Sequence, residues 1–580
     1  MKFGLSRHRL IRLGQLSLGA SAVLLTASAA FGGDSASNAV MVTNAASASS
    51  AAPVTRRLTA AQYRNIIADT FGNDIDLGGR LEPDVRDAGL LAAGASKATV
   101  TPAGMEQYDL MGRKIASQVL DEKHRRLFMP CSPKTTTAAD DACARQFLSK
   151  TGTSLYRRPL VKDELDAYVL AARRGAEITK DFYEGLGLSL SVMLSSPKFL
   201  FVTERIDPTS KSAPGTFAMD DYSKASQISF LLWNSSPDPQ LLKAAERGEL
   251  RTKEGLARQV DRMLGSRKLE RGLRSFFEDK FAFSEFETTK KDPALFPEFS
   301  AQVISDAQEQ TLRTIMDTVL VRKADYREIF TTKKTFLTRE LAAIYRVPLY
   351  GDGPNGSPDS WRPYEFAAND PRGGILTQVA FTALHSPAGR GSVTIRGKAV
   401  REVFLCQKVP PPPGEVDFSK FAEAATGGTA RMRLAQHAVD PACAGCHKAM
   451  DPIGFALENF DGQGAFRTTE NGLPIDTSGE LGGIKYNDAA GLGRALVESK
   501  AATRCLVSRL LAYAMGRPTG AADRDRIDEF NAYFAKQNYR VPELLREIAL
   551  SDSLYQVRIK ADPAAKPKIA SAATAATPKS

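Results

Sequence analysis

Apolar residues recur at helical spacing along most of this chain. Between residues 59 and 72, the apolar positions 63, 66, 67 and 71 fall on one helical face. Thr59 and Gln62 form a capping-box pattern before that face, and Gly72 follows it. This pattern predicts a helix that begins after Thr59 and ends at Gly72.

Comparable spacing predicts helices through the rest of the chain. Turns that contain proline, such as Ser196-Pro197 and Pro237–Pro239, separate them. No series of strictly alternating apolar and polar positions predicts a large β-sheet, so we expect a mainly α protein. The predicted helices follow Pro102, fill most of 140–205 and 222–345, and recur at 375–384, 397–405, 489–496, 502–514, 523–535 and 542–550.

Breaks in this pattern predict several helical subdomains. The segment 347–371 is rich in Pro, Gly, Asn and Asp and predicts a long loop or boundary. Residues 30–55 predict a flexible leader because they are rich in small and polar residues, and residues 558–580 predict a disordered basic tail. We expect helical domains at 56–135, 136–210, 216–346 and 474–557, and a further region at 370–468.

The first residues have the pattern of a secretory signal peptide. Residues 1–12 carry four basic side chains and no acid, residues 13–30 are largely apolar, and residues 27–30 resemble a cleavage site. We therefore expect a signal peptide at 1–29, a periplasmic or extracellular protein, and no transmembrane segment in the mature chain. A retained membrane anchor is the alternative.

Composition and charge limit the expected partners. Hydrophobic residues make up 43% of the chain and charged residues 25%, which suits a large buried core. Loss of residues 1–29 would lower the formal net charge from +11 to +7, and the tail carries much of the remainder. No basic cluster interleaved with aromatic residues is present, so we expect no nucleic-acid partner. Nothing in the sequence indicates an oligomeric state.

The pentapeptide Cys443-Ala444-Gly445-Cys446-His447 carries the clearest chemistry. C-x-x-C-H is the attachment pattern of a c-type haem. The two thiols can each add to one vinyl group of the porphyrin, and the adjacent His447 is then placed as an iron ligand. We therefore expect one covalent haem c, held by Cys443, Cys446 and His447.

Three other interpretations of the motif are open. A redox dithiol is disfavoured because no βαβ pattern surrounds it. Half of a zinc site with His437 or His447 is disfavoured because no second ligand pair follows. A tight structural disulfide between Cys443 and Cys446 is the third.

Polar residues that follow the motif are candidates for tuning the haem. Asp451, Glu458, Asp461 and Arg467 can set the iron potential or contact the haem propionates. We prefer Arg467 as the propionate partner because a guanidinium binds a carboxylate through two parallel bonds.

The sixth iron ligand is expected to be His385, which follows an apolar helix in a loop of Ser, Pro and Gly. Met450 lies only three residues after His447, about 4.5 Å along the same face if this stretch is helical, and is therefore disfavoured as a ligand on the far side of the ring. His437 would need a sharply returning loop, and Met515 suits an apolar core equally well.

The remaining cysteines predict two disulfides. Four cysteines allow three pairings, of which we expect Cys131 with Cys143 and Cys406 with Cys505. The first closes a short loop that has little core of its own, and the second joins the 370–468 region to the last helices. Disulfides agree with an oxidising compartment.

Several motifs together resemble a family of secreted multi-domain proteins, catalogued as planctomycete-type domains of unknown function with a cytochrome-c-like C-terminal part. The resemblance covers most of residues 56–557. It implies secretion, a cytochrome-c-like region at 370–468 and haem binding, but no established reaction. The motifs are R-R-L-T-x-x-x-Y-x-N at 56–65, L-Y-R-R-P-L at 155–160, S-S-P-K-F-L at 195–200, the segment 222–233, R-G-K-A-V-R-E-V-F-L-C at 396–406, C-A-G-C-H-K-A-M-D-P-I-G-F at 443–455 and L-L-A-Y-A-M-G-R at 510–517.

The expected function is single-electron transfer to or from a partner oxidoreductase, by a secreted monohaem protein. One alternative is a haem enzyme of peroxidase or oxygenase type, in which the large helical body forms a substrate pocket. The other is a non-enzymatic binding scaffold with a structural haem. No G-x-S-x-G, H-E-x-x-H or phosphate-binding loop suggests a different catalytic class.

Overall fold

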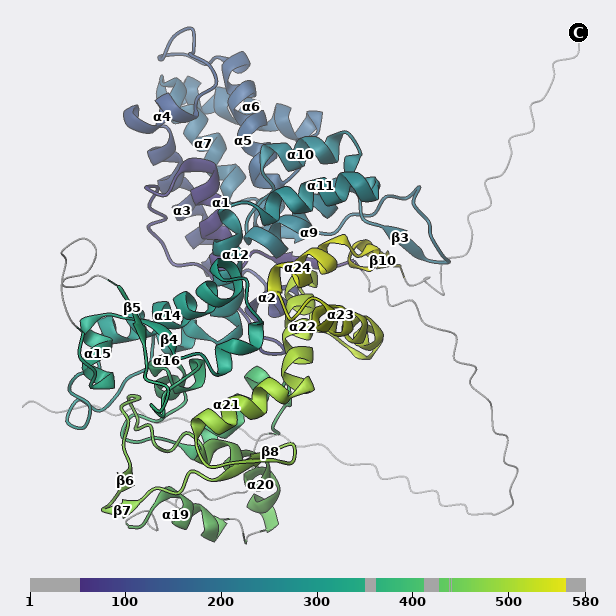
Figure 1. Cartoon of the computed structure of the whole chain (residues 1–580). Helices are drawn as coiled ribbons and strands as arrows, with labels where there is room; N and C mark the ends of the chain where they lie inside the picture. Colours follow the sequence, from purple (N-terminus) through teal and green to yellow (C-terminus); the bar gives the residue numbers. More distant parts are fainter. Residues whose placement is uncertain (1–52, 350–360, 411–426, 438, 440, 560–580) are drawn as a thin grey trace, which may run out of the picture. The chain divides into compact units, whose positions relative to one another are not determined.

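A computed structural model describes residues 53–349, 361–410, 427–437, 439 and 441–559. Over these residues the protein is mainly helical, as the apolar spacing predicts (Figure 1). The predicted signal peptide, most of the leader and most of the tail lie outside the described residues. Among the helices that are described, none is long and apolar enough to cross a membrane.

The first predicted helix is confirmed. α1 spans Ala60–Phe71, and Thr59 and Gln62 exchange the two hydrogen bonds of a capping box. The backbone leaves the helix at Gly72, whose φ of +94° favours glycine. The following helices are α2 (Leu91–Gly94), α3 (Pro102–Val119), α4 (Glu122–Phe128), α5 (Asp141–Tyr156), α6 (Lys162–Thr179), α7 (Phe182–Leu194) and α8 (Pro197–Leu200).

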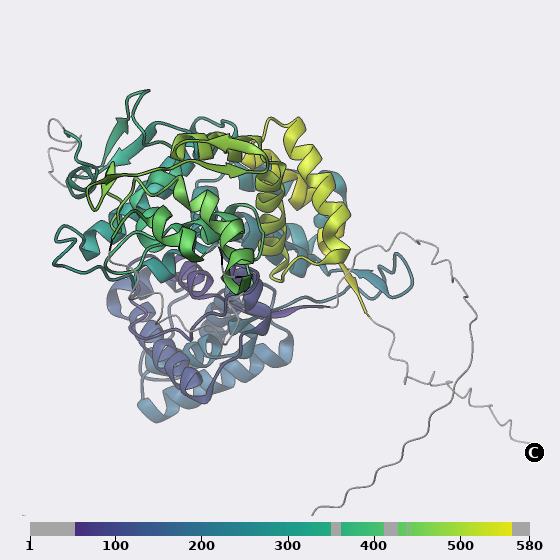
Figure 2. The same ribbon diagram turned by 90° about the horizontal axis from the view of Figure 1, so that it is seen from below.

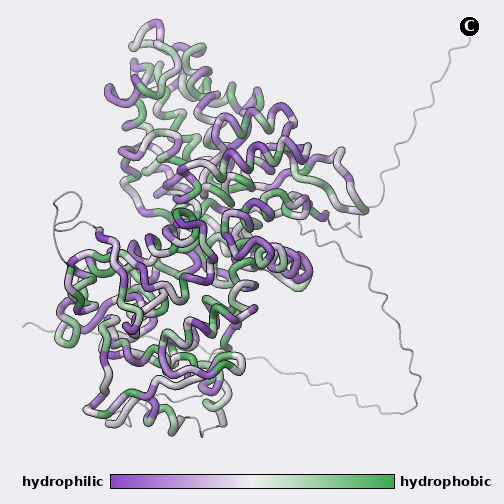
Figure 3. The backbone as a smooth tube through the Cα atoms, viewed as in Figure 1, coloured by the Kyte–Doolittle hydropathy of each residue, from purple (hydrophilic) through white to green (hydrophobic). Residues whose placement is uncertain are grey.

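The helices of the N-terminal part enclose a hydrophobic core of their own. Ile66 of α1, Phe147 of α5 and Leu190 of α7 are fully buried in it. Hydrophobic residues, green in Figure 3, recur at intervals along these helices. Amphipathic spacing in the sequence therefore predicts the buried faces as well as the helices.

A second and larger core joins the rest of the described chain. Trp233 of α9, Phe330, Ile453 of α20 and Leu510 of α22 are buried in it, so the regions at 216–346, 370–468 and 474–557 share apolar contacts. The last three helices, α22, α23 and α24, pack against one another (Figure 2). The helices of this part are α9 (Asp221–Trp233), α10 (Pro239–Glu246), α11 (Lys253–Leu264), α12 (Lys268–Lys280), α13 (Phe283–Phe286), α14 (Ala301–Met316), α15 (Arg339–Tyr345), α16 (Val379–Leu384), α17 (Val393–Ala399), α19 (Ala430–His437), α20 (Pro441–Phe455), α21 (Ala489–Glu498), α22 (Lys500–Met515), α23 (Arg524–Lys536) and α24 (Val541–Leu550).

Short strands pair at several points that the sequence did not predict. Their two to four residues are too few to show an alternating pattern. One of them, β5, lies inside the segment that was predicted as a long loop. The antiparallel pairs are β1 (Thr55–Arg57) with β2 (Phe201–Thr203), β3 (Thr216–Ala218) with β10 (Gln556–Arg558), β4 (Lys334–Leu337) with β5 (Arg362–Glu365), β6 (Thr469–Glu470) with β7 (Leu473–Pro474), and β8 (Gly479–Leu481) with β9 (Ile484–Tyr486).

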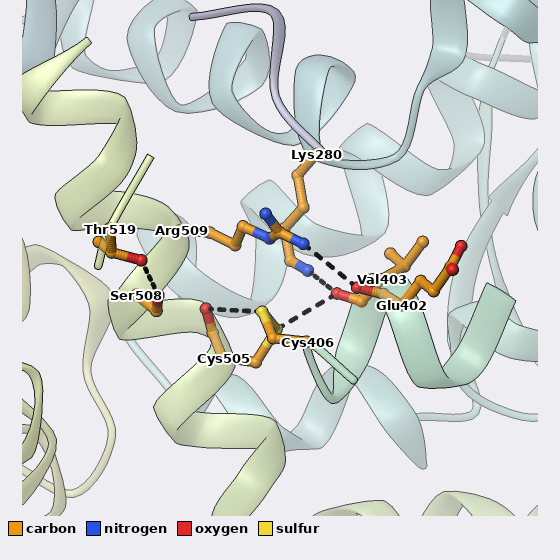
Figure 4. The surroundings of a disulfide bond; sticks show 8 residues. All are labelled: Lys280, Glu402, Val403, Cys406, Cys505, Ser508, Arg509 and Thr519. Atoms are coloured by element: carbon orange, nitrogen blue, oxygen red, sulfur yellow. Dashed lines mark hydrogen bonds between the residues drawn. A yellow bond between two sulfur atoms is a disulfide. The ribbon is translucent and has the colours of Figure 1, made fainter. Parts of the chain in front are cut away.

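Both predicted disulfides are confirmed. Cys131 pairs with Cys143, and Cys406 pairs with Cys505. The second bridge attaches the chain just after the π-helical segment Val400–Phe404, which follows α17, to α22 (Figure 4). The buried Lys280 lies beside it and donates to the Val403 carbonyl. The bridge therefore sits where three separate parts of the chain meet.

Candidate haem site

The C-x-x-C-H motif occupies the first half of α20. Cys443 and Cys446 are one helical turn apart and therefore lie on the same face. Both are free thiols and partly buried, whereas the other four cysteines are paired. Gly445 between them would carry a Cβ in open space, with no atom within 4 Å.

His447 is held by a carboxylate one turn further along the helix. Its Nδ1 lies 2.8 Å from Oδ2 of Asp451, and the other oxygen, Oδ1, accepts a bond of 2.9 Å from the Thr394 hydroxyl of α17. The His447 side chain is 19% exposed and that of Asp451 8%. The hydrogen bond to the Asp451 carboxylate raises the pKa of His447. With Nδ1 engaged, Nε2 is the nitrogen that would bind iron.

Two glycines bring α20 against α17. A Cβ on Gly454 would lie 1.9 Å from the Val393 carbonyl oxygen, and one on Gly397 would lie 2.0 Å from the Met450 carbonyl oxygen. Only glycine permits these backbones to approach so closely. The contact explains why position 454 is a glycine, and it places Thr394 beside Asp451.

A buried arginine fastens the end of α20. Arg396 of α17 is fully buried and donates from Nη1 to the carbonyls of Leu457 (2.8 Å) and Phe460 (2.6 Å). Its Nη2 reaches the Thr382 carbonyl at the end of α16 (3.1 Å). Burial lowers the pKa of Arg396 to about 10. The guanidinium therefore stays charged at neutral pH and joins α16, α17 and the turn after α20.

Arg467, the predicted propionate partner, makes an ion pair with Glu458. Its Nη2 contacts Oε1 of Glu458, and its Nε donates to the Glu458 backbone carbonyl at 3.3 Å. Glu458 is buried, and burial raises the pKa of its carboxyl. The structure thus places Arg467 beyond the C-terminal end of α20, whereas the two thiols lie near its beginning.

His385, the predicted sixth ligand, lies at the end of α16. Its ring packs edge-on against Phe381, with centroids 4.7 Å apart. Lys291 binds the carbonyls of Ala383 (2.8 Å) and Ser386 (2.7 Å) on either side. Burial, together with the cations Arg396 and Lys291, lowers the pKa of His385 to about 3. His385 is therefore neutral, as an iron ligand must be, but its described contacts are with the core around α16.

The described side chains fit a covalent haem better than they fit zinc. They offer two free thiols at the required spacing, followed by an imidazole whose Nδ1 has a partner. No group of three His, Cys, Asp or Glu side chains within the described parts of the chain is arranged to hold a metal ion. Thr394 and Arg396 support the site but were not assigned a role from the sequence, because the residues in and just after α20 that they bind lie more than fifty residues further along the chain.

Five consecutive segments match models of protein families. The chain is similar to five families of unknown function. The match at 372–470 has the label PSCyt3 and contains the whole C-x-x-C-H motif. All five families are described as proteins of unknown function. They are DUF1587 at 56–121, DUF1595 at 143–204, DUF1592 at 219–347, DUF1588 at 372–470 and DUF1585 at 482–554.

The resemblance to a multi-domain set of such domains is therefore confirmed, while its cytochrome-c-like part stays a prediction. No curated protein and no solved structure matches the chain.

Proposed function

We propose that the protein is exported, carries one haem c on Cys443 and Cys446 with His447 as iron ligand, and transfers single electrons to or from a partner oxidoreductase. The observation that carries the proposal is the pair of unbridged thiols on one face of α20, next to an oriented histidine. Bound there, the haem would supply a one-electron couple.

The chain's own residues perform the supporting tasks. The thiols would hold the porphyrin through two thioether bonds, and Asp451 fixes the orientation of the His447 ring. The close α17–α20 contact and Arg396 hold the helix in place. Such a rigid site suits an electron carrier, because it keeps the movement of atoms small when one electron is exchanged.

A haem enzyme is the second candidate function. The contact between His447 and the Asp451 carboxylate favours this second function. An imidazole that donates to a carboxylate is more basic and pushes electron density toward iron. His385 decides between the two: as a sixth ligand it would give a low-spin ferric spectrum that does not change on adding small ligands. A high-spin spectrum that changes with an added ligand would favour the enzyme.

Attachment is tested with the full chain, expressed with its leader in a host that attaches haem c. An alkaline pyridine spectrum should give one haem c per chain, and haem stain should remain on a denaturing gel. Cys443→Ser and Cys446→Ser should each reduce covalent haem, whereas the double variant Cys131→Ser/Cys143→Ser should keep it. A purified protein with zinc and no haem would overturn the proposal.

A further inference from the structure

Asp451 connects two helices through one carboxylate. Oδ2 bonds His447 on its own helix, four residues earlier, and Oδ1 accepts from Thr394 on α17. Only 8% of the Asp451 side chain is exposed, so solvent screens its charge weakly. The second bond, from a neighbouring helix, restrains the carboxylate that contacts His447.

We propose that Asp451, held by Thr394, is a positioning residue that lowers the reduction potential of iron bound at His447. The inference rests on the proposed function and goes beyond it, because it assigns the residue that sets how readily the site accepts an electron. A carboxylate acceptor on Nδ1 raises the basicity of a ligating imidazole. A more basic ligand stabilises ferric over ferrous iron, since it donates more charge to the metal.

The fixed negative charge acts in the same direction. It favours the more positive, ferric state of the iron, and the low exposure of the side chain preserves this effect. A purely structural role for Asp451, as a tie between α20 and α17, would predict a loss of stability and no change in potential. Redox titration separates these two roles.

The test compares reduction potentials of haem-loaded variants. For Asp451→Asn, we expect the ratio of reduced to oxidised protein at a fixed ambient potential to rise at least tenfold, which is a shift of 59 mV for one electron. Thr394→Val keeps the charge but removes one bond to it, and should raise the ratio by a smaller factor, about threefold. Asp451→Glu should restore part of the wild-type value.

Glu480→Gln is the matched control for charge. Glu480 is an exposed carboxylate on β8, the strand that packs against α20, and its loss changes the net charge by the same amount. We expect less than a twofold change in the ratio. A potential of Asp451→Asn no higher than that of Glu480→Gln would overturn the inference.

Failure of the inference and failure of the proposed function are distinguishable. A wild-type protein without covalent haem refutes the proposed function, whereas haem-loaded variants with unchanged potentials refute only the role of Asp451. If Asp451→Asn takes up no haem, Thr394→Val decides, because it retains the carboxylate. A wild-type potential in Thr394→Val would then overturn the inference.

Discussion

Gly454 is one of two glycines at which the backbones of α20 and α17 come close together. Gly454→Ala would drive a methyl group into the Val393 carbonyl, 1.9 Å from the added atom. Overpacking of this kind costs about 1–3 kcal/mol. We expect a lower midpoint of urea unfolding and less covalent haem.

Gly445→Ala is the control for Gly454→Ala, since it makes the same change in the same helix but meets no atom within 4 Å. It should keep the haem and gain up to about 1 kcal/mol from helix propensity. Equal loss of stability in both variants would contradict the proposed close contact.

Arg396 donates hydrogen bonds to several buried carbonyls. Arg396→Met would remove this donor from the Thr382, Leu457 and Phe460 carbonyls. The Thr382 carbonyl would keep its bond from Ser386 Oγ, and the Leu457 carbonyl would keep its bond from the Phe460 N–H, so the main cost is the Phe460 carbonyl. An unsatisfied buried group costs about 1–3 kcal/mol, and we expect a loss of that size in the free energy of unfolding.

The control for Arg396→Met is Lys398→Met, which removes an exposed cation from the same helix and should change this free energy by less than about 0.5 kcal/mol. The measurement is chemical denaturation of both variants. A loss in Lys398→Met as large as that in Arg396→Met would show that removal of helix charge, and not of the carbonyl donor, is the cause.

At the scale of the element, the Glu164 carboxylate near the start of α6 accepts several hydrogen bonds. Glu164 accepts two bonds from Arg158, at 2.7 and 2.8 Å, and one from the Val161 backbone N–H. The bond from Arg158 is the main cause that lowers the pKa of Glu164 to about 2. The folded protein therefore binds fewer protons at this residue than the unfolded chain between about pH 2 and 4.5.

Glu164 should consequently stabilise the protein above about pH 4.5, and the contribution should disappear as the pH falls toward 2. We expect Glu164→Gln to lose about 2 kcal/mol at pH 7 and much less at pH 2.5. Unfolding midpoints of wild type and variant at both pH values measure this. Glu177→Gln, which removes an exposed carboxylate from the same helix, is the control and should change the unfolding midpoint at pH 7 by little.

Helices were predictable from sequence at this scale because their signals are local. The α1 helix was recognised from Thr59, Gln62 and a repeated apolar spacing, all within fourteen residues. Strands β1 and β2 were not recognised, since three-residue strands show no period and Thr55 pairs with Thr203 far along the chain. The C-x-x-C-H motif was equally local, whereas the bond from Thr394 to Asp451 depends on how two helices pack.

At the scale of the whole molecule, the two disulfides differ in the length of chain that they close. Cys406–Cys505 spans 99 residues and includes α20, while Cys131–Cys143 spans 12. Loop-closure entropy predicts that the longer bridge contributes about 2 kcal/mol more. We expect Cys406→Ala/Cys505→Ala to lower the urea midpoint more than Cys131→Ala/Cys143→Ala. The reverse order would show that local packing outweighs loop entropy.

The pairing of β3 with β10 also affects how early β3 can find its partner strand after synthesis. Phe217 pairs with Val557, and the Met219 N–H donates to the Tyr555 carbonyl at 2.8 Å, so β3 needs the last described strand of the chain. At the usual rates of synthesis, roughly 20–70 s separate the appearance of the two strands. During that interval the backbone edge of β3 is a template for another copy's strand. Chains that have formed β3 but not yet β10 are therefore the population in which this protein is most exposed to mispairing.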